Sequence, residues 1–510
     1  MRILHLTPEL APWSKSGGLG DAAAALAKSV AALGHEVRVV TPLHGSIAGR
    51  STMPLHRQSL SIGLRPSATA QVRRAEGPGF TALFLENDAI YGGAEIYGGD
   101  AGLKAAFLTR GGLDLCLADG WVPDVVHVHD WTVALAPVLL NTVLRDTDLG
   151  RCASVLTLHN LQHQGLLGRE LMDTLDLPEW LLTPDNLECL GGINLLKGGI
   201  YHATRLTTVS PTYAREIAEP AQGFGLDPVI RHRGADLEGI LNGVDSDDWN
   251  PARDTLIPAR YSADDLTGKR TCKSGLQQDL GLDLDPGIPL VGVVSRLWDQ
   301  KGLDLALEPL RLRLRAGRLQ FALLGSGDPA LESAYRGLAE ELPGRAAVRI
   351  GYDNRLAHRI EAGADFFLMP SRFEPCGLNQ MYSMAYGTLP IVRRTGGLAD
   401  TVTAWHPGSA DATGIVFEHA DSAAIGWALD QALALAYEHP GEFDAMRIRA
   451  MRRRFTWTDA AHRYVACYTE AIRQRRGAFD LPAPAAVPES PSLPRARTAR
   501  PKAKRPARKA

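Results

Sequence analysis

Short apolar runs alternate along the first half of the chain with stretches in which apolar residues recur at helical spacing. The apolar runs lie at residues 2–7, 36–41, 125–131, 155–158 and 206–209. The alanine-rich stretch 21–33 predicts a helix between the first two runs, because Gly34 follows it as a stop signal. Strands that are apolar on both faces are typical of parallel sheets, so the pattern predicts a doubly wound α/β domain.

The second half of the chain repeats this alternation and predicts a second α/β domain. Predicted strands, or the ends of predicted strands, lie at residues 289–294, 323–327, 349–352, 364–370 and 389–392. Between the two sets, residues 240–245 form a predicted strand end and turn, and a Trp-Asn-Pro sequence at 249–251 breaks any regular element there. We therefore place the domain boundary after Asp245.

The stretch 371–397 concentrates candidate chemistry at the end of a predicted strand. Its first loop contains Glu374 and Gly377, and a Thr-Gly-Gly sequence at 395–397 opens another predicted helix. Glycine lets the backbone approach a ligand closely, and a helix N-terminus offers free N–H groups. Because ligands of open parallel sheets lie beyond the carboxyl ends of the strands, we expect a phosphate or a sugar to bind here.

Polar residues also follow predicted strands in the first half of the chain. Asp130 closes one apolar run, His159 follows the next, and a glycine-rich loop at 14–21 carries Lys15. This loop matches neither a Walker loop nor a GxGxxG sequence. Its amides and Lys15 are candidate phosphate contacts, and Asp130 and His159 are candidate catalytic residues.

Two cations follow the first strand predicted in the second half. Arg296 and Lys301 lie just beyond the run 289–294. A guanidinium and an ammonium group at one strand end suit a diphosphate, so we expect these side chains to bind one.

Composition fits a globular protein of two domains. At 510 residues the chain exceeds what one compact core holds, and its 45% hydrophobic and 22% charged residues are ordinary. The six cysteines form no CxxC pair, so neither a disulfide framework nor a zinc site is indicated. The N-terminus lacks a signal-peptide pattern, and no run reaches the ~18 apolar residues of a membrane span. We therefore expect a cytoplasmic protein with no membrane contact.

The end of the chain differs in composition from the rest. From Leu481 it is rich in Pro and Ala, and from Arg495 it carries eight Lys and Arg residues and no acid. Such a segment has little apolar surface to offset its ordering entropy, so we expect a disordered tail over residues 479–510. A basic tail can contact an acidic partner, although it is more often a solvated appendage.

The ordered set of motifs resembles one family. From residue 1 to about residue 475 the chain is similar to the bacterial glycogen synthases and plant starch synthases, which are retaining glucosyltransferases. The motifs that carry this resemblance are KSGGLGD at 15–21, HVHDW at 127–131, LHNL at 158–161, NGVD at 242–245, SRL at 295–297, QKGLD at 300–304, SRFEPCGL at 371–378 and RTGGL at 394–398.

The resemblance implies the GT-B fold, in which two Rossmann-like domains flank a deep cleft. It implies an N-terminal acceptor-side domain at 1–245 and a domain that binds the nucleotide sugar at 246–455. A final helix at 456–478 would cross back to the first domain, ahead of the tail. The implied reaction transfers glucose from ADP-glucose to the non-reducing end of an α-1,4-glucan with retention of configuration, in glycogen biosynthesis. No cofactor or metal ion is expected.

The resemblance also implies a role for each candidate residue. Near the transferred glucose and the leaving diphosphate it places the catalytic residues Glu374, His159, Asp130, Arg296 and Lys301. Contacts to the substrates are implied for Lys15, Gly18, Asp21, Asn242, Cys376, Gly377, Thr395, Gly396 and Gly397. In particular, the Thr-Gly-Gly sequence at 395–397 would contact the glucosyl donor on its phosphate side.

The chain departs from the broader pattern of retaining GT-B enzymes at three positions. Many of these enzymes carry a second glutamate eight residues after the first, and here Tyr382 stands there, as is usual for glycogen and starch synthases. His163 replaces an expected tyrosine, and Trp298 replaces a small polar residue. These two changes affect expected contacts to the acceptor or the nucleotide and leave the expected reaction unchanged.

Several alternatives stay open at this point. UDP-glucose could replace ADP-glucose, and a small sugar could be the acceptor, as in sucrose- or trehalose-type glucosyltransferases. Glucan phosphorylases share the fold but use pyridoxal phosphate, which would colour the protein. From a different class, the chain could be a non-catalytic glucan-binding protein, although the presence of Lys15, Arg296, Lys301 and Glu374 argues against this.

Overall fold

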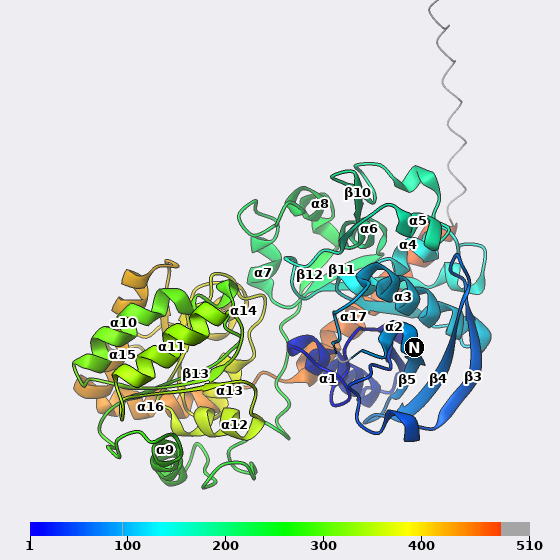
Figure 1. The fold of residues 1–510 in the computed structure, drawn as a ribbon. Helices are drawn as coiled ribbons and strands as arrows, with labels where there is room; N and C mark the ends of the chain where they lie inside the picture. The colour runs from blue at the N-terminus through cyan, green and yellow to red at the C-terminus, as the bar shows by residue number, and fades with distance from the viewer. Residues whose placement is uncertain (94, 481–510) are drawn as a thin grey trace, which may run out of the picture.

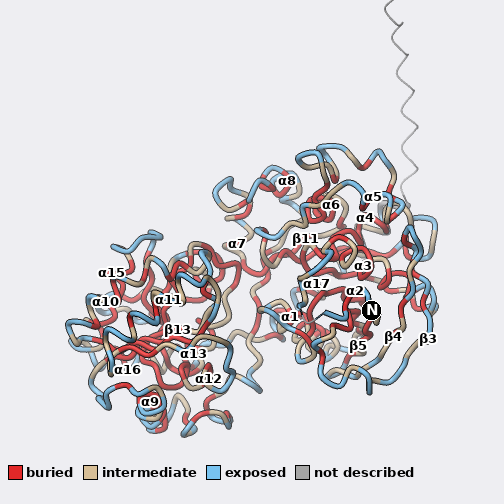
Figure 2. The backbone as a smooth tube through the Cα atoms, viewed as in Figure 1, coloured by how far each residue is buried: buried red, intermediate tan, exposed pale blue. Residues whose placement is uncertain are grey.

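The computed structural model describes residues 1–93 and 95–480, which form two lobes, each built on its own β-sheet (Figure 1). The first lobe contains a nine-stranded sheet and the second a six-stranded sheet. In both lobes the central strands are buried and the outer faces of the helices are exposed, whereas the last two strands at one edge of the first sheet are largely exposed (Figure 2). The predicted basic tail lies outside the described residues, apart from its first two.

The sheet of the first lobe is parallel through its centre and ends in an antiparallel extension. Its order is β12-β11-β7-β6-β1-β2-β5-β4-β3, and β4 pairs antiparallel with both β5 and β3, whereas the other pairs are parallel. The bounds are β1 (Arg2–Leu6), β2 (Glu36–Pro42), β3 (Leu55–Ile62), β4 (Ala68–Glu76), β5 (Thr81–Glu86), β6 (Val125–His129), β7 (Ala153–Leu158), β11 (Arg205–Thr208) and β12 (Leu237–Gly239). The predicted apolar runs correspond to β1, β2, β6, β7 and β11, whereas β3, β4 and β5 were not predicted.

Helices cover both faces of this sheet. They are α1 (Gly18–Ala32), α2 (Asp88–Tyr91), α3 (Ala101–Ala118), α4 (Ala136–Asn141), α5 (Glu170–Thr174), α6 (Leu195–His202), α7 (Pro211–Glu216) and α8 (Asp227–His232). A small separate sheet, in the order β8-β10-β9, joins β8 (Leu166–Leu167), β9 (Glu188–Cys189) and β10 (Gly192–Asn194). The first helix begins three residues before the predicted start, because the glycine-rich loop already turns into it.

The sheet of the second lobe is parallel throughout. Its order, β15-β14-β13-β16-β17-β18, is that of a Rossmann sheet, in which the order of the strands reverses between β13 and β16. The strands are β13 (Leu290–Val294), β14 (Gln320–Gly325), β15 (Ala346–Ile350), β16 (Phe366–Met369), β17 (Leu389–Arg393) and β18 (Ile415–Phe417). Ligand sites are expected at such a switch point, and β13 and β16 carry the two motifs that were predicted to bind phosphate and sugar.

The helices of the second lobe follow its strands in alternation. They are α9 (Thr267–Leu280), α10 (Leu303–Arg315), α11 (Pro329–Glu341), α12 (Asn354–Gly363), α13 (Asn379–Ala385), α14 (Gly396–Thr401), α15 (Ser422–Glu438) and α16 (Pro440–Arg452). Gly387, with a φ of 65°, follows α13 as the sequence predicted. None of the described helices is long and apolar enough to cross a membrane.

The last helix, α17 (Trp457–Asp480), belongs to the first lobe, although α16 belongs to the second (Figure 1). Where the chain crosses back, the Val244 N–H donates to the Phe455 carbonyl, so the two crossing segments pair. Trp457, Tyr464 and Tyr468 are then buried in one cluster with residues of α1 and the sheet. Residues 453–456 separate α16 from α17, which lies where the final helix at 456–478 was expected. The predicted domain limits themselves remain a prediction.

Candidate active site

A cavity of about 1080 Å³ lies between the two lobes, at the carboxyl ends of both central sheets. Most of the residues predicted from the sequence line it, although they are far apart along the chain. Those that line it are Lys15, Gly18, Asp21, Asp130, His159, Asn242, Arg296, Lys301, Glu374, Cys376 and Gly377. The GT-B arrangement thus brings strand ends of both sheets to one cavity.

Glu374 is held from two sides. Its carboxylate oxygen Oε2 lies 2.6 Å from Lys301 Nζ and accepts a hydrogen bond of 2.9 Å from the Ser371 hydroxyl. The residue is only 5% exposed, so this ion pair is largely shielded from water. Lys301, predicted as a diphosphate contact, therefore also fixes the orientation of the carboxylate.

The second cation of the phosphate motif is placed differently. Arg296 lies on the loop that follows β13, lines the cavity and is exposed. Among the described residues no carboxylate pairs with its guanidinium, whereas its charge, after burial, helps to lower the pKa of His163 across the cavity. Arg296 is thus a cation on the cavity wall that is available to a ligand.

Asp130 holds the strand end on which His159 lies. Its carboxylate oxygen Oδ1 accepts hydrogen bonds from the backbone N–H groups of His159 (2.7 Å) and Asn160 (3.3 Å). Its backbone, with φ 62° and ψ −172°, occupies a region largely restricted to glycine, where a side chain costs of order 1–3 kcal/mol. Burial raises the pKa of Asp130 to about 7. Backbone strain and a perturbed pKa are features that cluster at active sites, so both agree with the prediction of Asp130 as a catalytic residue, which stays a prediction.

The glycine-rich loop is held by a residue that the sequence did not single out. The Glu9 carboxylate accepts hydrogen bonds from the backbone N–H groups of Ser16 and Gly17, from the Ser16 hydroxyl and from the Tyr97 hydroxyl. Lys15 lies 3.2 Å from the Asp21 carboxylate, so the two predicted residues pair with each other. Sequence spacing gives no sign of the Glu9 contacts, because Tyr97 comes from a distant loop.

One group of predicted contacts lies behind the site. Thr395, Gly396 and Gly397 are buried and do not line the cavity, so their predicted contact with the phosphate stays a prediction. A Cβ on Gly396 would lie 1.9 Å from the Glu374 carbonyl oxygen, which shows how tightly this turn packs under the loop. The Gly396 N–H donates to the Glu216 carboxylate at 3.0 Å. The turn therefore supports the Glu374 loop.

Aromatic residues that sequence reasoning missed line the cavity as well. Tyr352 is 75% exposed on the rim of the second lobe. Trp249, on the segment that crosses between the lobes, stacks on Tyr382 at 4.0 Å and on His358 at 4.0 Å. A tyrosine face exposed in a cavity is a stacking surface for a flat ring.

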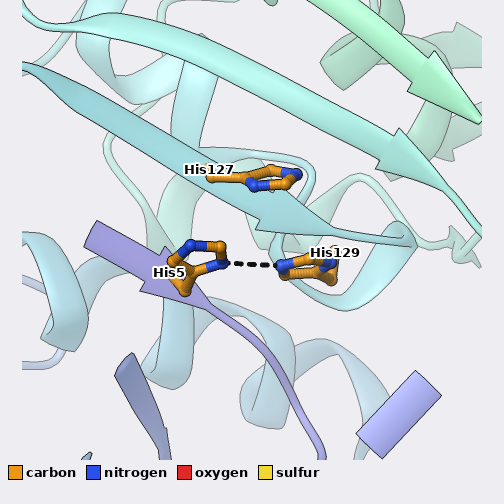
Figure 3. Close-up of side chains that lie close together, drawn as sticks. All are labelled: His5, His127 and His129. Atoms are coloured by element: carbon orange, nitrogen blue, oxygen red, sulfur yellow. Dashed lines mark hydrogen bonds between the residues drawn. The ribbon is translucent and has the colours of Figure 1, made fainter. Parts of the chain in front are cut away.

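Three buried histidines below the site have ligand-capable nitrogens within 4.8 Å of one another (Figure 3). They are His5, His127 and His129. Both nitrogens of His127 have partners, namely the Tyr468 hydroxyl at 2.8 Å and the Thr157 hydroxyl at 2.6 Å. The nitrogens of His5 and His129 that face each other are 3.0 Å apart, which is a hydrogen-bonding distance. The present geometry is that of a hydrogen-bonded cluster.

Two family models match most of the chain. The starch synthase catalytic domain matches residues 2–232, and glycosyl transferases group 1 matches residues 281–448. The first match ends just before β12, and the second spans the parallel sheet of the second lobe.

Curated relatives match nearly the whole chain. A glycogen synthase of Anaeromyxobacter sp. (strain Fw109-5) is 47% identical over 477 residues, which cover 92% of this chain and 99% of the relative. A glycogen synthase of Myxococcus xanthus is 43% identical over 93% of this chain and 100% of the relative.

Solved structures agree with this assignment. The catalytic domain of starch synthase IV from Arabidopsis thaliana, bound to ADP and acarbose, superposes with a TM-score of 0.87 at 30% identity, over 92% of this chain and 99% of that one. A sucrose-phosphate synthase from Thermosynechococcus elongatus has a TM-score of 0.59 at 17% identity over 92% of this chain and 99% of that one, so it shares the fold alone. The chain belongs to the glycogen and starch synthase family of GT-B glucosyltransferases.

Proposed function

We propose that this enzyme transfers glucose from ADP-glucose to the non-reducing end of an α-1,4-glucan and retains the α-configuration. The observation that carries the proposal is the cavity between the lobes, where Arg296 and Lys301 face the glycine-rich loop and Lys15. Curated relatives named glycogen synthase cover almost the whole chain, and ADP occupies the related starch synthase IV. Both support a nucleotide sugar as the glucosyl donor and a glucan as the acceptor.

The diphosphate of the glucosyl donor lies between the two lobes in this proposal. Arg296 and Lys301 bind it from the second lobe, and Lys15 and the amide of Gly18 bind it from the first. The electrostatic stabilisation that these groups provide is greatest as the C1–O bond breaks, because negative charge then builds up on the diphosphate. The exposed ring of Tyr352, which lines the same cavity, stacks on the base.

The glucose lies deeper in the cavity, against Glu374 and the strand end at His159. The Glu374 carboxylate and the backbone of Cys376 and Gly377 bind ring hydroxyls, and Asn242 adds an amide. The bond between C1 and the diphosphate oxygen breaks, and the acceptor hydroxyl forms a bond to C1 on the same face. Its proton passes to the leaving diphosphate oxygen, so no protein base is required.

In this mechanism the cations of the chain neutralise the diphosphate, so neither a metal ion nor pyridoxal phosphate takes part. Transfer should therefore persist in the presence of a chelator, and the purified protein should be colourless. We place the reaction in the cytoplasm, where a glucan acceptor is available. The basic segment after residue 480 is free in this scheme to contact an acidic partner.

The experiment that tests the proposal offers each glucosyl donor with each acceptor. Release of nucleoside diphosphate is measured with ADP-glucose or UDP-glucose, and with glycogen, fructose or glucose 6-phosphate as the acceptor. We expect transfer from ADP-glucose to glycogen to be fastest. Faster turnover with UDP-glucose would overturn the proposed glucosyl donor, and transfer only to small sugars would overturn the acceptor.

A further inference from the structure

A chain of hydrogen bonds runs from the buried core of the first lobe to the cavity. His5 Nδ1 lies 3.0 Å from His129 Nε2 (Figure 3). His129 Nδ1 in turn lies 3.0 Å from His159 Nε2. His5 and His129 are 0% and 1% exposed, whereas His159 lines the cavity. The residues come from strands β1 and β6 and from the end of β7, so neighbouring strands of one sheet align them.

Only two arrangements of protons fit these contacts. Burial lowers the pKa of His5 to about 3 and that of His159 to about 4, and it lowers the pKa of His129 well below its usual value. All three rings are therefore neutral near neutral pH, and each carries one N–H. Because each contact needs one proton, every ring must donate in the same direction, either towards the cavity or towards His5.

The two ends of this series of hydrogen bonds, at His5 and at His159, distinguish the two directions of donation. His5 Nε2 is buried and has no hydrogen-bonding partner among the described residues. If the rings donated towards His5, that atom would be a buried, unpaired N–H, and among backbone groups unpaired buried donors are rarer than under-satisfied acceptors. If they donate towards the cavity, His5 Nε2 carries only an unpaired acceptor lone pair. The remaining N–H then lies on His159 Nδ1, where it can donate a hydrogen bond to a ligand.

We infer that His5 and His129 fix the tautomer of His159, so that His159 Nδ1 presents an N–H to a sugar oxygen in the cavity. His5 and His129 are positioning residues in this scheme, since neither touches the substrate. Helix α17 seals the cluster, because Tyr468 from that helix bonds to the neighbouring ring of His127. A hydroxyl that must accept from His159 keeps its own proton free for another partner, which restricts how the sugar is oriented.

The first test reads the tautomer directly and does not depend on the glucosyl donor. The full-length protein is labelled with ¹⁵N-histidine, and the long-range ¹H–¹⁵N correlations of each ring are recorded near neutral pH. A His159→Gln variant identifies the signals of His159 by their loss. We expect the proton of His159 on Nδ1. A proton on Nε2, or a doubly protonated ring, would overturn the inference.

The second test uses two variants of nearly equal shape and rests on the proposed function. In His129→Asn the amide nitrogen lies roughly where Nδ1 was and can still donate to His159, whereas His129→Leu cannot donate. We expect kcat of the Leu variant to be lower than that of the Asn variant by about tenfold, the size of one hydrogen bond. ADP affinity should be equal in the two.

Equal kcat values in the two variants would contradict the inference. If neither variant folds, the NMR measurement of the His159 tautomer in the unaltered protein tests the inference alone. If instead ADP-glucose is not used at all, the variants are compared with whichever glucosyl donor is turned over, so a failure of the proposed function is recognised separately.

Discussion

The ammonium group of Lys301 lies 2.6 Å from the carboxylate of Glu374, and thereby joins the residue expected at the diphosphate to the residue expected at the sugar. Their side chains are 20% and 7% exposed, so the pair is shielded from water. In the proposed mechanism, Lys301 strengthens its contact with the diphosphate as the C1–O bond breaks, while Ser371 keeps Glu374 oriented. One connected group of side chains would then bind both halves of the glucosyl donor.

We expect Lys301→Met to lower kcat by about 10²-fold or more, because the charge that stabilises the leaving diphosphate is removed while the length of the side chain is kept. Steady-state rates and ADP affinity are measured on the same preparation. Arg372→Met is the control, since Arg372 pairs with Asp304 outside the cavity. An unchanged kcat with only a raised KM would show that Lys301 binds the ground state and the transition state equally.

Asp130 should make stability depend on pH. Burial raises its pKa to about 7 in the folded state, from 3.8 in the unfolded chain. Between these values only the folded state keeps the proton, so stability is lost as pH rises through this window. We expect Asp130→Asn to show a smaller loss of Tm than the unaltered protein over the same range.

A matched variant checks the sign of this effect. Arg372 lowers the pKa of Asp304, so the stability that Asp304 contributes is present above its unfolded pKa and is lost as pH falls. Asp304→Asn should therefore lose Tm mainly at neutral pH and little in acid. Identical pH profiles for Asp130→Asn and the unaltered protein would show that Asp130 is ionised in the folded state throughout.

The two lobes are joined beside the cavity by α7 and α14. The Glu216 carboxylate accepts from the Gly396 N–H and the Thr395 hydroxyl, and the Thr212 hydroxyl donates to Asp400 at 2.6 Å. We expect Glu216→Ala to weaken this contact and to enlarge the radius of gyration of the ligand-free protein in small-angle scattering. Glu219→Ala, an exposed residue three positions on, should not. Equal scattering curves for the two variants would exclude Glu216 as a link between the lobes.

Much of the site could be predicted, because parallel sheets collect their strand ends along one edge. Asp130, His159, Arg296 and Glu374 each follow an apolar run, and the structure places all four on one cavity wall or the other. Predicting that these four residues lie at the cavity requires only that each strand be recognised and that the sheets be parallel.

What the sequence could not supply are the contacts that depend on how distant segments meet. Glu9 holds the glycine-rich loop together with Tyr97, and Glu216 occupies the N–H of Gly396 that was expected to face a phosphate. Trp249 stacks on Tyr382 only because the segment that crosses between the lobes passes beside α13 of the second lobe. Apolar periodicity and motif spacing carry no information on these long-range pairs.

Removing the basic segment should leave catalysis intact. A chain that ends at Asp480 keeps all of α17, whose buried residues complete the core of the first lobe. The thirty residues removed are rich in Pro, Ala, Lys and Arg, so they have little apolar surface to bury. We expect Tm and kcat to be nearly unchanged and any effect to appear in salt-sensitive association with acidic partners. A large fall in Tm would show that the segment docks on the folded chain.

Glu374 is the carboxylate best placed to orient the glucose ring. It is 5% exposed, lines the cavity and is fixed by Lys301 and Ser371, and Tyr382 stands where many retaining GT-B enzymes have a second glutamate. In the proposed mechanism, charge-assisted hydrogen bonds from ring hydroxyls to this carboxylate hold the sugar for attack on the face from which the diphosphate leaves. We expect no covalent link between Glu374 and C1, because its oxygens are committed to the ring hydroxyls and to Lys301.

Glu374→Gln keeps the shape of the side chain and removes its charge, so it separates the two roles that this residue could have. We expect the variant to fold, to bind ADP nearly as tightly as the unaltered protein and to lose most of kcat, on the order of 10²-fold. Ser371→Ala removes only the neutral hydrogen bond to Oε2 and should cost far less. Turnover of Glu374→Gln at the unaltered rate would remove Glu374 from the sugar site. A loss of ADP affinity would instead place it at the nucleotide, because the lost charge would then have acted through Lys301 on the diphosphate.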